Sequence, residues 1–168
     1  YLYCLNTNLP DYKKKIVYIY IDSLHKKNKL YKKKFNVLMI CSLKKYKGIA
    51  EFINISNLLK HRNDISFTLV LNSELPEINN FLNEYSLNVE SNLRIFPSNI
   101  TTKKYYSQAS IVLNLSLPDQ WVESFGLTIL EGMSYGCPII APNFGGPTEI
   151  ISDGVDGFLV NPYNLVEI

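Results

Sequence analysis

Long apolar runs and clustered cysteines are both missing from this sequence of 168 residues. No run approaches the roughly 18 to 20 uninterrupted apolar residues that cross a bilayer, and no charged-then-apolar leader is present. The three cysteines, Cys4, Cys41 and Cys137, lie far apart and show no CxxC or Cys/His ligand spacing. We therefore expect a cytoplasmic chain with no structural metal.

Two recognition patterns are also absent. No G-x-G-x-x-G follows the early strands, which argues against an NAD-dependent Rossmann domain. No recognition helix, RNP or zinc-finger pattern is present either, so nucleic acid is not an expected partner.

Charge is unevenly distributed, although the net charge is only +2. Residues 1–47 hold 12 lysines and 2 acidic residues, whereas residues 48–168 hold 5 basic and 13 acidic ones. The early lysines either form a solvated surface or approach phosphates or an anionic membrane, which would place the protein at the inner face of the membrane.

Apolar runs that resemble strands alternate with longer amphipathic stretches, as in βαβ units around a parallel sheet. Buried strands are predicted at 16–21, 35–41, 67–71, 93–96, 111–115, 138–141 and 158–160, and helices at 49–59, 77–85, 101–108 and from near 126 and 147. With 46% apolar residues, we expect one α/β domain over 1–168: a Rossmann-like parallel sheet flanked by helices, with residues 1–34 as linker and first strand.

The helix near Gly126 is predicted to present Leu127, Leu130 and Met133 inward and to end at Gly136, with Pro138 following. The short helix before residue 108 is predicted to be capped by Thr101 and Thr102.

Two carboxylates bracket the start of that later helix: Glu123 precedes it and Glu131 lies within it. Sugar hydroxyls bind carboxylate acceptors, while a diphosphate favours the free N–H groups and positive dipole of a helix N-terminus. One short element could hold both halves of a nucleotide-sugar. The nearby Trp121 either lines such a pocket with Asp119 and Gln120 or lies in the core.

Residues 123–162 resemble the donor-binding signature of the retaining glycosyltransferases of family 4, whose GT-B fold pairs two Rossmann-like domains across a cleft. The resemblance rests on the E-x7-E pair, on Gly145-Gly146 followed by Glu149, and on Lys47-Gly48 after an early strand. Weaker similarity extends back to about Phe35.

The resemblance implies a role for each matching residue. Glu123 would face the transferred sugar, Glu131 the ribose hydroxyls, and Lys47 the leaving diphosphate. Ser42 stands where the family usually has an arginine. The phosphates would meet the amides of Phe125, Gly126, Leu127 and Thr128, and the base would lie against Phe96 and Pro97.

The same resemblance implies transfer of a sugar from a nucleoside-diphosphate sugar to an acceptor hydroxyl with retention, in surface polysaccharide or lipopolysaccharide assembly. No Asp-x-Asp occurs in the sequence, so we expect donor binding without a metal or other cofactor. Because the acceptor domain would precede this chain, which begins at Tyr1, the chain is expected to be a fragment that binds the donor without turnover. Two alternatives stay open: a sugar-nucleotide 2-epimerase, and a non-catalytic scaffold subunit, which Ser42 keeps in view.

Overall fold

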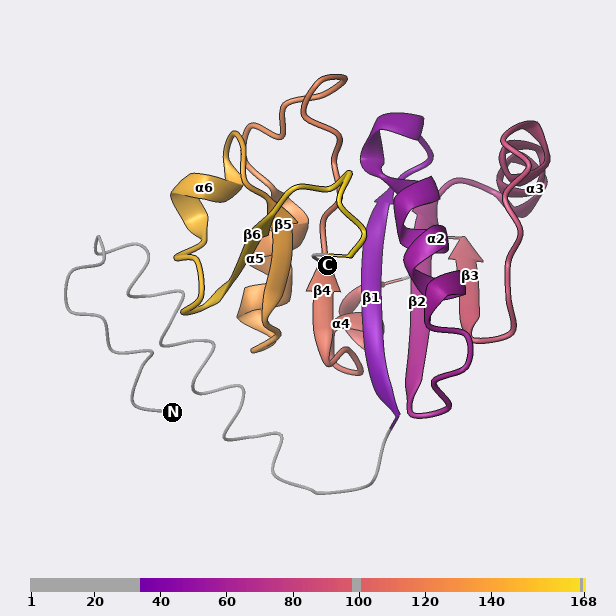
Figure 1. Cartoon of the computed structure of the whole chain (residues 1–168), viewed down its shortest axis with the longest axis horizontal. Helices are drawn as coiled ribbons and strands as arrows, with labels where there is room; N and C mark the ends of the chain where they lie inside the picture. Colours follow the sequence, from indigo (N-terminus) through magenta and orange to yellow (C-terminus); the bar gives the residue numbers. More distant parts are fainter. Residues whose placement is uncertain (1–33, 98–100, 167) are drawn as a thin grey trace.

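A computed structural model describes residues 34–97, 101–166 and 168. Within them, six parallel strands form one sheet in the order β3-β2-β1-β4-β5-β6 (Figure 1). The strands are β1 (Phe35–Ser42), β2 (Ile65–Asn72), β3 (Leu93–Pro97), β4 (Ile111–Leu113), β5 (Ile139–Pro142) and β6 (Gly157–Val160). The predicted Rossmann-like α/β class is confirmed, while the strand predicted at 16–21 lies outside the described residues.

Helices cover both faces of this sheet. They are α2 (Ile49–Leu58), α3 (Leu75–Glu84), α4 (Lys103–Tyr106), α5 (Leu127–Ser134) and α6 (Pro147–Ile150), with a 3-10 turn, η2 (Lys45–Lys47), between β1 and α2. None of the described helices is long and apolar enough to cross a membrane.

Alternate residues of β1 divide the core into two layers, since neighbouring side chains of a strand point to opposite faces. Met39 packs in a cluster with Phe52 of α2, and Leu38 packs in a second cluster with Ile129 of α5. All four side chains are 0–1% exposed. A sheet buried on both faces explains why the strand sequences are almost continuously apolar.

The predicted inward face of α5 is partly wrong. Met133 is buried and Leu130 packs against the core, but Leu127 is 66% exposed and Ile129 is fully buried instead. The helix begins after Gly126, whose backbone is left-handed (φ 69°), so its first residue lies at the edge of the sheet rather than over it.

The end of α5 is as predicted. Gly136 has φ 69° and donates its N–H to the Met133 carbonyl, and the Cys137 N–H bonds the Gly132 carbonyl. These two bonds make a Schellman motif, which terminates the helix and leads directly into β5.

Several element boundaries differ from prediction by one or two residues. Thr102 occupies the N-cap of α4 but its side chain makes no capping hydrogen bond, and the helix ends at Tyr106 rather than near 108. β4 ends at Leu113, because Asn114 turns the chain by accepting a hydrogen bond from the Ser116 N–H at 3.1 Å. α3 begins two residues early, since Glu77 accepts the Glu74 N–H.

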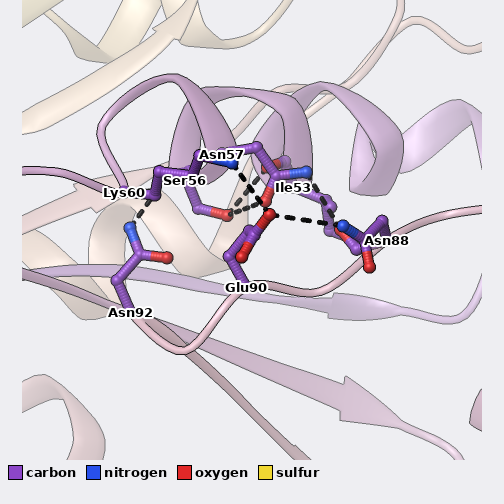
Figure 2. Close-up of polar contacts among 7 residues, drawn as sticks. All are labelled: Ile53, Ser56, Asn57, Lys60, Asn88, Glu90 and Asn92. Carbon is purple, nitrogen blue, oxygen red and sulfur yellow. Dashed lines mark hydrogen bonds and ion pairs between the residues drawn. The ribbon is translucent and has the colours of Figure 1, made fainter.

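Polar contacts tie the connection between α3 and β3 to the end of α2 (Figure 2). The Asn57 side-chain amide donates to the Asn88 carbonyl at 2.9 Å, and the Asn92 amide donates to the Ser56 carbonyl at 2.8 Å. Since Asn92 immediately precedes β3, these bonds help hold this edge strand in register with β2.

Candidate functional site

A pocket of about 310 Å³ lies between the carboxyl ends of β1 and β4. The chain leaves β1 toward β2 and β3, and later returns to β4 on the other side of β1, so the strand order reverses at this point. Such a switch point is where open parallel sheets bind ligands. The pocket is lined by residues 39–42, Lys47, residues 114–116 and residues 123–128.

An ion pair between Lys47 and Glu123 crosses this pocket. Lys47 Nζ lies 2.7 Å from Glu123 Oε2, and the two side chains are only 18% and 16% exposed. Lys47 comes from η2 after β1, and Glu123 from the loop between β4 and α5, so the fold joins residues 76 positions apart. The Ser116 hydroxyl donates to the same Glu123 oxygen at 3.3 Å.

These contacts decide the ionisation of Glu123. Burial alone raises the pKa of its carboxyl group, but the hydrogen bond and charge of Lys47, together with Ser116 and the Gly126 backbone, outweigh burial and lower the pKa below its usual 4.5. Glu123 therefore presents a negative charge beside a fixed ammonium group, both at the wall of one pocket.

The N-terminus of α5 forms another wall of the pocket, through Gly126, Leu127 and Thr128. The first N–H groups of an α-helix have no acceptor within the helix, and they carry the positive end of its dipole. This wall can therefore bind the oxygens of an anionic group.

Gly145 and Gly146 contact the backbone of the loop that carries Glu123. The Gly146 N–H donates to the Glu123 carbonyl at 2.7 Å, and a Cβ atom on Gly146 would lie 2.3 Å from the Ser124 carbonyl oxygen. Only glycine allows this approach, so the Gly-Gly turn before α6 fixes the backbone of the Glu123 loop.

Seven predicted site residues line the pocket: Ser42, Lys47, Glu123, Phe125, Gly126, Leu127 and Thr128. The other three do not. Glu131 is exposed on α5 and accepts a hydrogen bond from the Tyr106 hydroxyl at 2.8 Å, while Phe96 and Pro97 end β3 at the sheet edge.

Phe96 lines a separate hollow of about 200 Å³ with Arg94, Lys104 and Tyr105. Residues 98–100, against which the base was also expected to lie, are outside the described residues.

The lining residues that sequence reasoning missed include Asn114, Ser116 and Cys41. Asn114 and Ser116 are polar residues that interrupt an apolar run, and this interruption is the signal that the sequence contained; the structure buries both. Burial raises the pKa of the Cys41 thiol to about 12, and the charge of Lys47 opposes this only in part. Cys41 therefore lines the pocket as a neutral apolar group.

Trp121 is neither a core residue nor part of the pocket lining. It is 46% exposed, and its ring stacks on Tyr46 with centroids 5.2 Å apart. Lys47 Nζ lies 5.6 Å from the Trp121 ring centroid. The tryptophan thus borders the site from outside, next to the cation of the ion pair.

Among residues 34–97, 101–166 and 168, no three His, Cys, Asp or Glu side chains are grouped so as to hold a metal ion. The charges in the described pocket come from one ammonium group, one carboxylate and a helix N-terminus.

The strand order and the pocket at the switch point define a Rossmann-like α/β domain of the kind that forms the C-terminal half of GT-B glycosyltransferases. The chain belongs to the group 1 glycosyl transferases, since residues 21–168 match the family described as Glycosyl transferases group 1. The predicted family and fold are thereby confirmed.

Individual proteins show where the similarity is concentrated. A sucrose synthase of Thermosynechococcus vestitus is 59% identical over 46 residues, which are 27% of this chain and 6% of that enzyme. The chain thus spans a small fraction of that relative's length.

Solved structures extend the similarity to most of the chain. The C-terminal domain of LpcC, a group 1 family protein of Francisella tularensis, has a TM-score of 0.61 and 26% identity, covering 80% of this chain and 71% of that domain. HepE of Anabaena, solved in complex with UDP and glucose, has a TM-score of 0.66 and 24% identity, covering 79% of this chain and 36% of that one.

Proposed function

We propose that this chain forms the donor site of a retaining glycosyltransferase, which transfers a sugar from a nucleoside-diphosphate sugar to an acceptor hydroxyl. The observation that carries the proposal is the Lys47–Glu123 ion pair beside the N-terminus of α5, at the switch point of the sheet. One wall of the pocket suits a diphosphate, and the carboxylate suits sugar hydroxyls. The fold that this chain shares with HepE accommodates UDP and glucose in that protein.

Lys47 can serve the diphosphate without releasing Glu123. An ammonium group has three donors, and only one is directed to Glu123 Oε2. The others remain for phosphate oxygens, next to the first N–H groups of α5. In the transfer step, the bond between the anomeric carbon and the diphosphate oxygen breaks, and the leaving diphosphate takes the electron pair. The acceptor hydroxyl oxygen bonds the anomeric carbon, and its proton passes to the diphosphate. A preorganised donor of this kind typically contributes about 3 kcal/mol to the stabilisation of developing negative charge.

Glu123 would orient the sugar. Its carboxylate is ionised, and Lys47 and Ser116 bind one of its oxygens; because two carboxylate oxygens offer about four acceptor positions, the group can still accept a hydrogen bond from a sugar hydroxyl. Glu131, one turn along α5 from Leu127, would accept the ribose hydroxyls, and the base would lie toward Phe96 and Pro97.

Binding of the diphosphate by Lys47 and the helix N-terminus makes a divalent metal unnecessary, so we propose a metal-independent site. We further propose that an acceptor domain completes the enzyme and that the chain alone binds the donor without turnover. Surface polysaccharide or lipopolysaccharide assembly, at the cytoplasmic face of a membrane, is the proposed setting; the lysine-rich residues before 35 support it by their charge.

Calorimetry with UDP, GDP and ADP tests the donor site. Lys47→Ala should weaken binding of the preferred nucleotide at least tenfold, because it removes a charged phosphate contact. Lys44→Ala is the matched control: Lys44 is exposed and outside the pocket lining, and its removal should leave the affinity within about twofold. Equal losses in both variants would contradict the assignment of Lys47.

A non-catalytic scaffold is the alternative that one observation favours: Ser42 lines the pocket where a second cation is expected. The two functions differ in nucleotide binding. If neither the chain nor its Ser42→Arg variant bound any of the three nucleoside diphosphates, the scaffold would be supported and the donor site rejected.

A further inference from the structure

Tyr106 of α4 donates its hydroxyl hydrogen bond to Glu131 Oε2 of α5, across 2.8 Å. The two residues belong to different helices, and the contact joins a buried ring to an exposed carboxylate: Tyr106 is 1% exposed, whereas Glu131 lies on the open side of α5. This bond links the pocket helix to α4, the helix that follows β3 in the chain.

We propose that Tyr106 is a positioning residue of the nucleotide site, whose hydroxyl orients the Glu131 carboxylate toward the two ribose hydroxyls of a nucleoside diphosphate. The inference rests on the proposed donor-binding function and deepens it, since it assigns ribose selection to a pair of residues rather than to Glu131 alone.

A free glutamate on a helix surface has three rotatable side-chain bonds, and ordering them costs conformational entropy. The hydrogen bond from the Tyr106 hydroxyl orders the Glu131 side chain before a ligand binds, so less entropy is lost on binding. It does not use up the carboxylate, because two oxygens offer about four acceptor positions. Oε1 and the remaining lone pair of Oε2 can still accept two hydroxyls of a cis-diol.

The tyrosine itself is rigidly held. Its ring stacks on Tyr135 with centroids 5.6 Å apart and 14° between planes, and its carbonyl accepts a contact from Cys137 Sγ at 3.6 Å. Burial first, and then the neighbouring Glu131, raise the pKa of the Tyr106 hydroxyl, so it remains a proton donor throughout the neutral range. A fixed donor of this kind aims the carboxylate in one direction.

A purely structural role would also give Tyr106 a hydrogen bond, since buried tyrosine hydroxyls usually find a partner. The two roles differ in what they do to ligand discrimination. Positioning affects the ribose contact alone, whereas loss of packing affects every ligand equally.

The experiment compares UDP, GDP and ADP with their 2′-deoxy counterparts by calorimetry on the whole chain, in the wild type and in Tyr106→Phe. Phenylalanine keeps the ring and its stacking and removes only the donor. Tyr135→Phe is the matched control, because it removes a hydroxyl from the partner ring that is not the donor to Glu131. Melting temperatures of all variants establish that they are folded.

In the wild type, the ribonucleotide should bind about tenfold more tightly than the deoxyribonucleotide, as for loss of one charged hydrogen bond. In Tyr106→Phe this ratio should fall below about threefold, through weaker ribonucleotide binding, while Tyr135→Phe keeps the wild-type ratio. A wild-type ratio in Tyr106→Phe, or equal weakening of both ligands, would overturn the positioning role.

Glu131→Gln separates failure of this inference from failure of the proposed function. If Glu131→Gln reduces the ratio and Tyr106→Phe does not, Tyr106 is structural but the ribose site stands. If Glu131→Gln keeps the full ratio, the ribose role of Glu131 is wrong, and the role of Tyr106 is rejected with it. Absence of nucleotide binding by the wild type rejects both. In a Glu131→Gln background, Tyr106→Phe should have no further effect on the ratio.

Discussion

At the scale of single residues, Glu123 is held by both its side chain and its backbone. Its side chain meets Lys47 and Ser116, and its backbone carbonyl meets the Gly146 N–H. Glu123 is therefore fixed by three contacts, two at its carboxylate and one at its backbone carbonyl, which come from three different connections of the sheet. A residue that only compensated the dipole of α5 would not need such support.

The Lys47–Glu123 pair makes stability depend on pH in a defined direction. The pKa of Glu123 is below its usual 4.5 in the folded protein, so the stabilisation is present above that value and is lost as pH falls through the lower folded pKa. At pH 7, Glu123→Gln should lower the free energy of unfolding by about 1 to 3 kcal/mol. The difference from wild type should shrink steadily below pH 4.5, as measured by urea unfolding across pH.

Asp119→Asn provides the control for this experiment. Asp119 lies in the same loop but is exposed and outside the pocket lining. The difference in the free energy of unfolding between Asp119→Asn and wild type should be the same at every pH. A Glu123→Gln difference that stayed constant from pH 7 to pH 3 would show that the ion pair is not its source.

Several residues of the pocket could be predicted from the sequence, but the contacts between them could not. Glu123 is predicted from its place before a helix together with the family resemblance, and Lys47 from that resemblance alone, but the contact between them depends on two loops that meet over the switch point. The contribution of Ser116 depends on where β4 ends, and Asn114 decides that through a local hydrogen bond. The position of Trp121 on Tyr46 depends on packing between loops, which has no sequence period.

At the scale of elements, the strands and the helices α2 and α3 follow directly from apolar periodicity, because each has a face pressed against the sheet. The register of α5 does not, since Leu127 lies at the pocket edge where no sheet covers it. Boundaries depended on single polar contacts, such as the one between Glu74 and Glu77. Apolar periodicity predicts which face of a helix is buried against the sheet. It does not predict the orientation of a helix turn that lines a pocket.

Gly48 joins two elements of the site and should not tolerate a side chain. It ends η2 and begins α2 with φ 76°, and a Cβ atom would lie 2.1 Å from the Leu115 carbonyl oxygen. Gly48→Ala should therefore reduce the free energy of unfolding by about 3 kcal/mol or more, from backbone strain plus displacement of the segment after β4. Denaturant unfolding measures the loss.

Gly154→Ala separates the two contributions. Gly154 has nearly the same backbone conformation, φ 72°, but a Cβ atom there would meet nothing within 4 Å. Only the left-handed strain applies, and the loss should be about 1 kcal/mol. If both variants lost the same free energy of unfolding, the close approach of Gly48 to Leu115 would not contribute to the loss in Gly48→Ala.

At the scale of the whole molecule, charge is separated along the sequence: lysines precede β1, and acidic residues dominate after it. The strands run parallel (Figure 1), and the pocket lies at their carboxyl end, between β1 and β4. If the chain acts at a membrane surface, the early lysines would attract it to anionic lipid, and the pocket would bind the donor.

This arrangement predicts binding of the chain to vesicles that contain anionic lipid. Sedimentation with phosphatidylserine vesicles at low salt should retain the chain, and binding should be lost near 0.5 M salt, where the screening length is only a few ångströms. Replacing Lys13, Lys14 and Lys15 with glutamate should weaken binding at least tenfold, at about 1 kcal/mol per lysine removed. Equal retention by neutral phosphatidylcholine vesicles would contradict the electrostatic mechanism.

The contact between the Gly145-Gly146 turn and the Glu123 loop has a consequence for protein engineering. A designer who transplanted residues 116–126 into another α/β scaffold would carry over the carboxylate but not the Gly146 N–H that holds its backbone. The smallest portable unit is therefore discontinuous, and it includes the turn after β5 together with η2. Libraries that vary sugar preference should leave both glycines untouched and diversify the exposed neighbours, such as Val122 and Phe144.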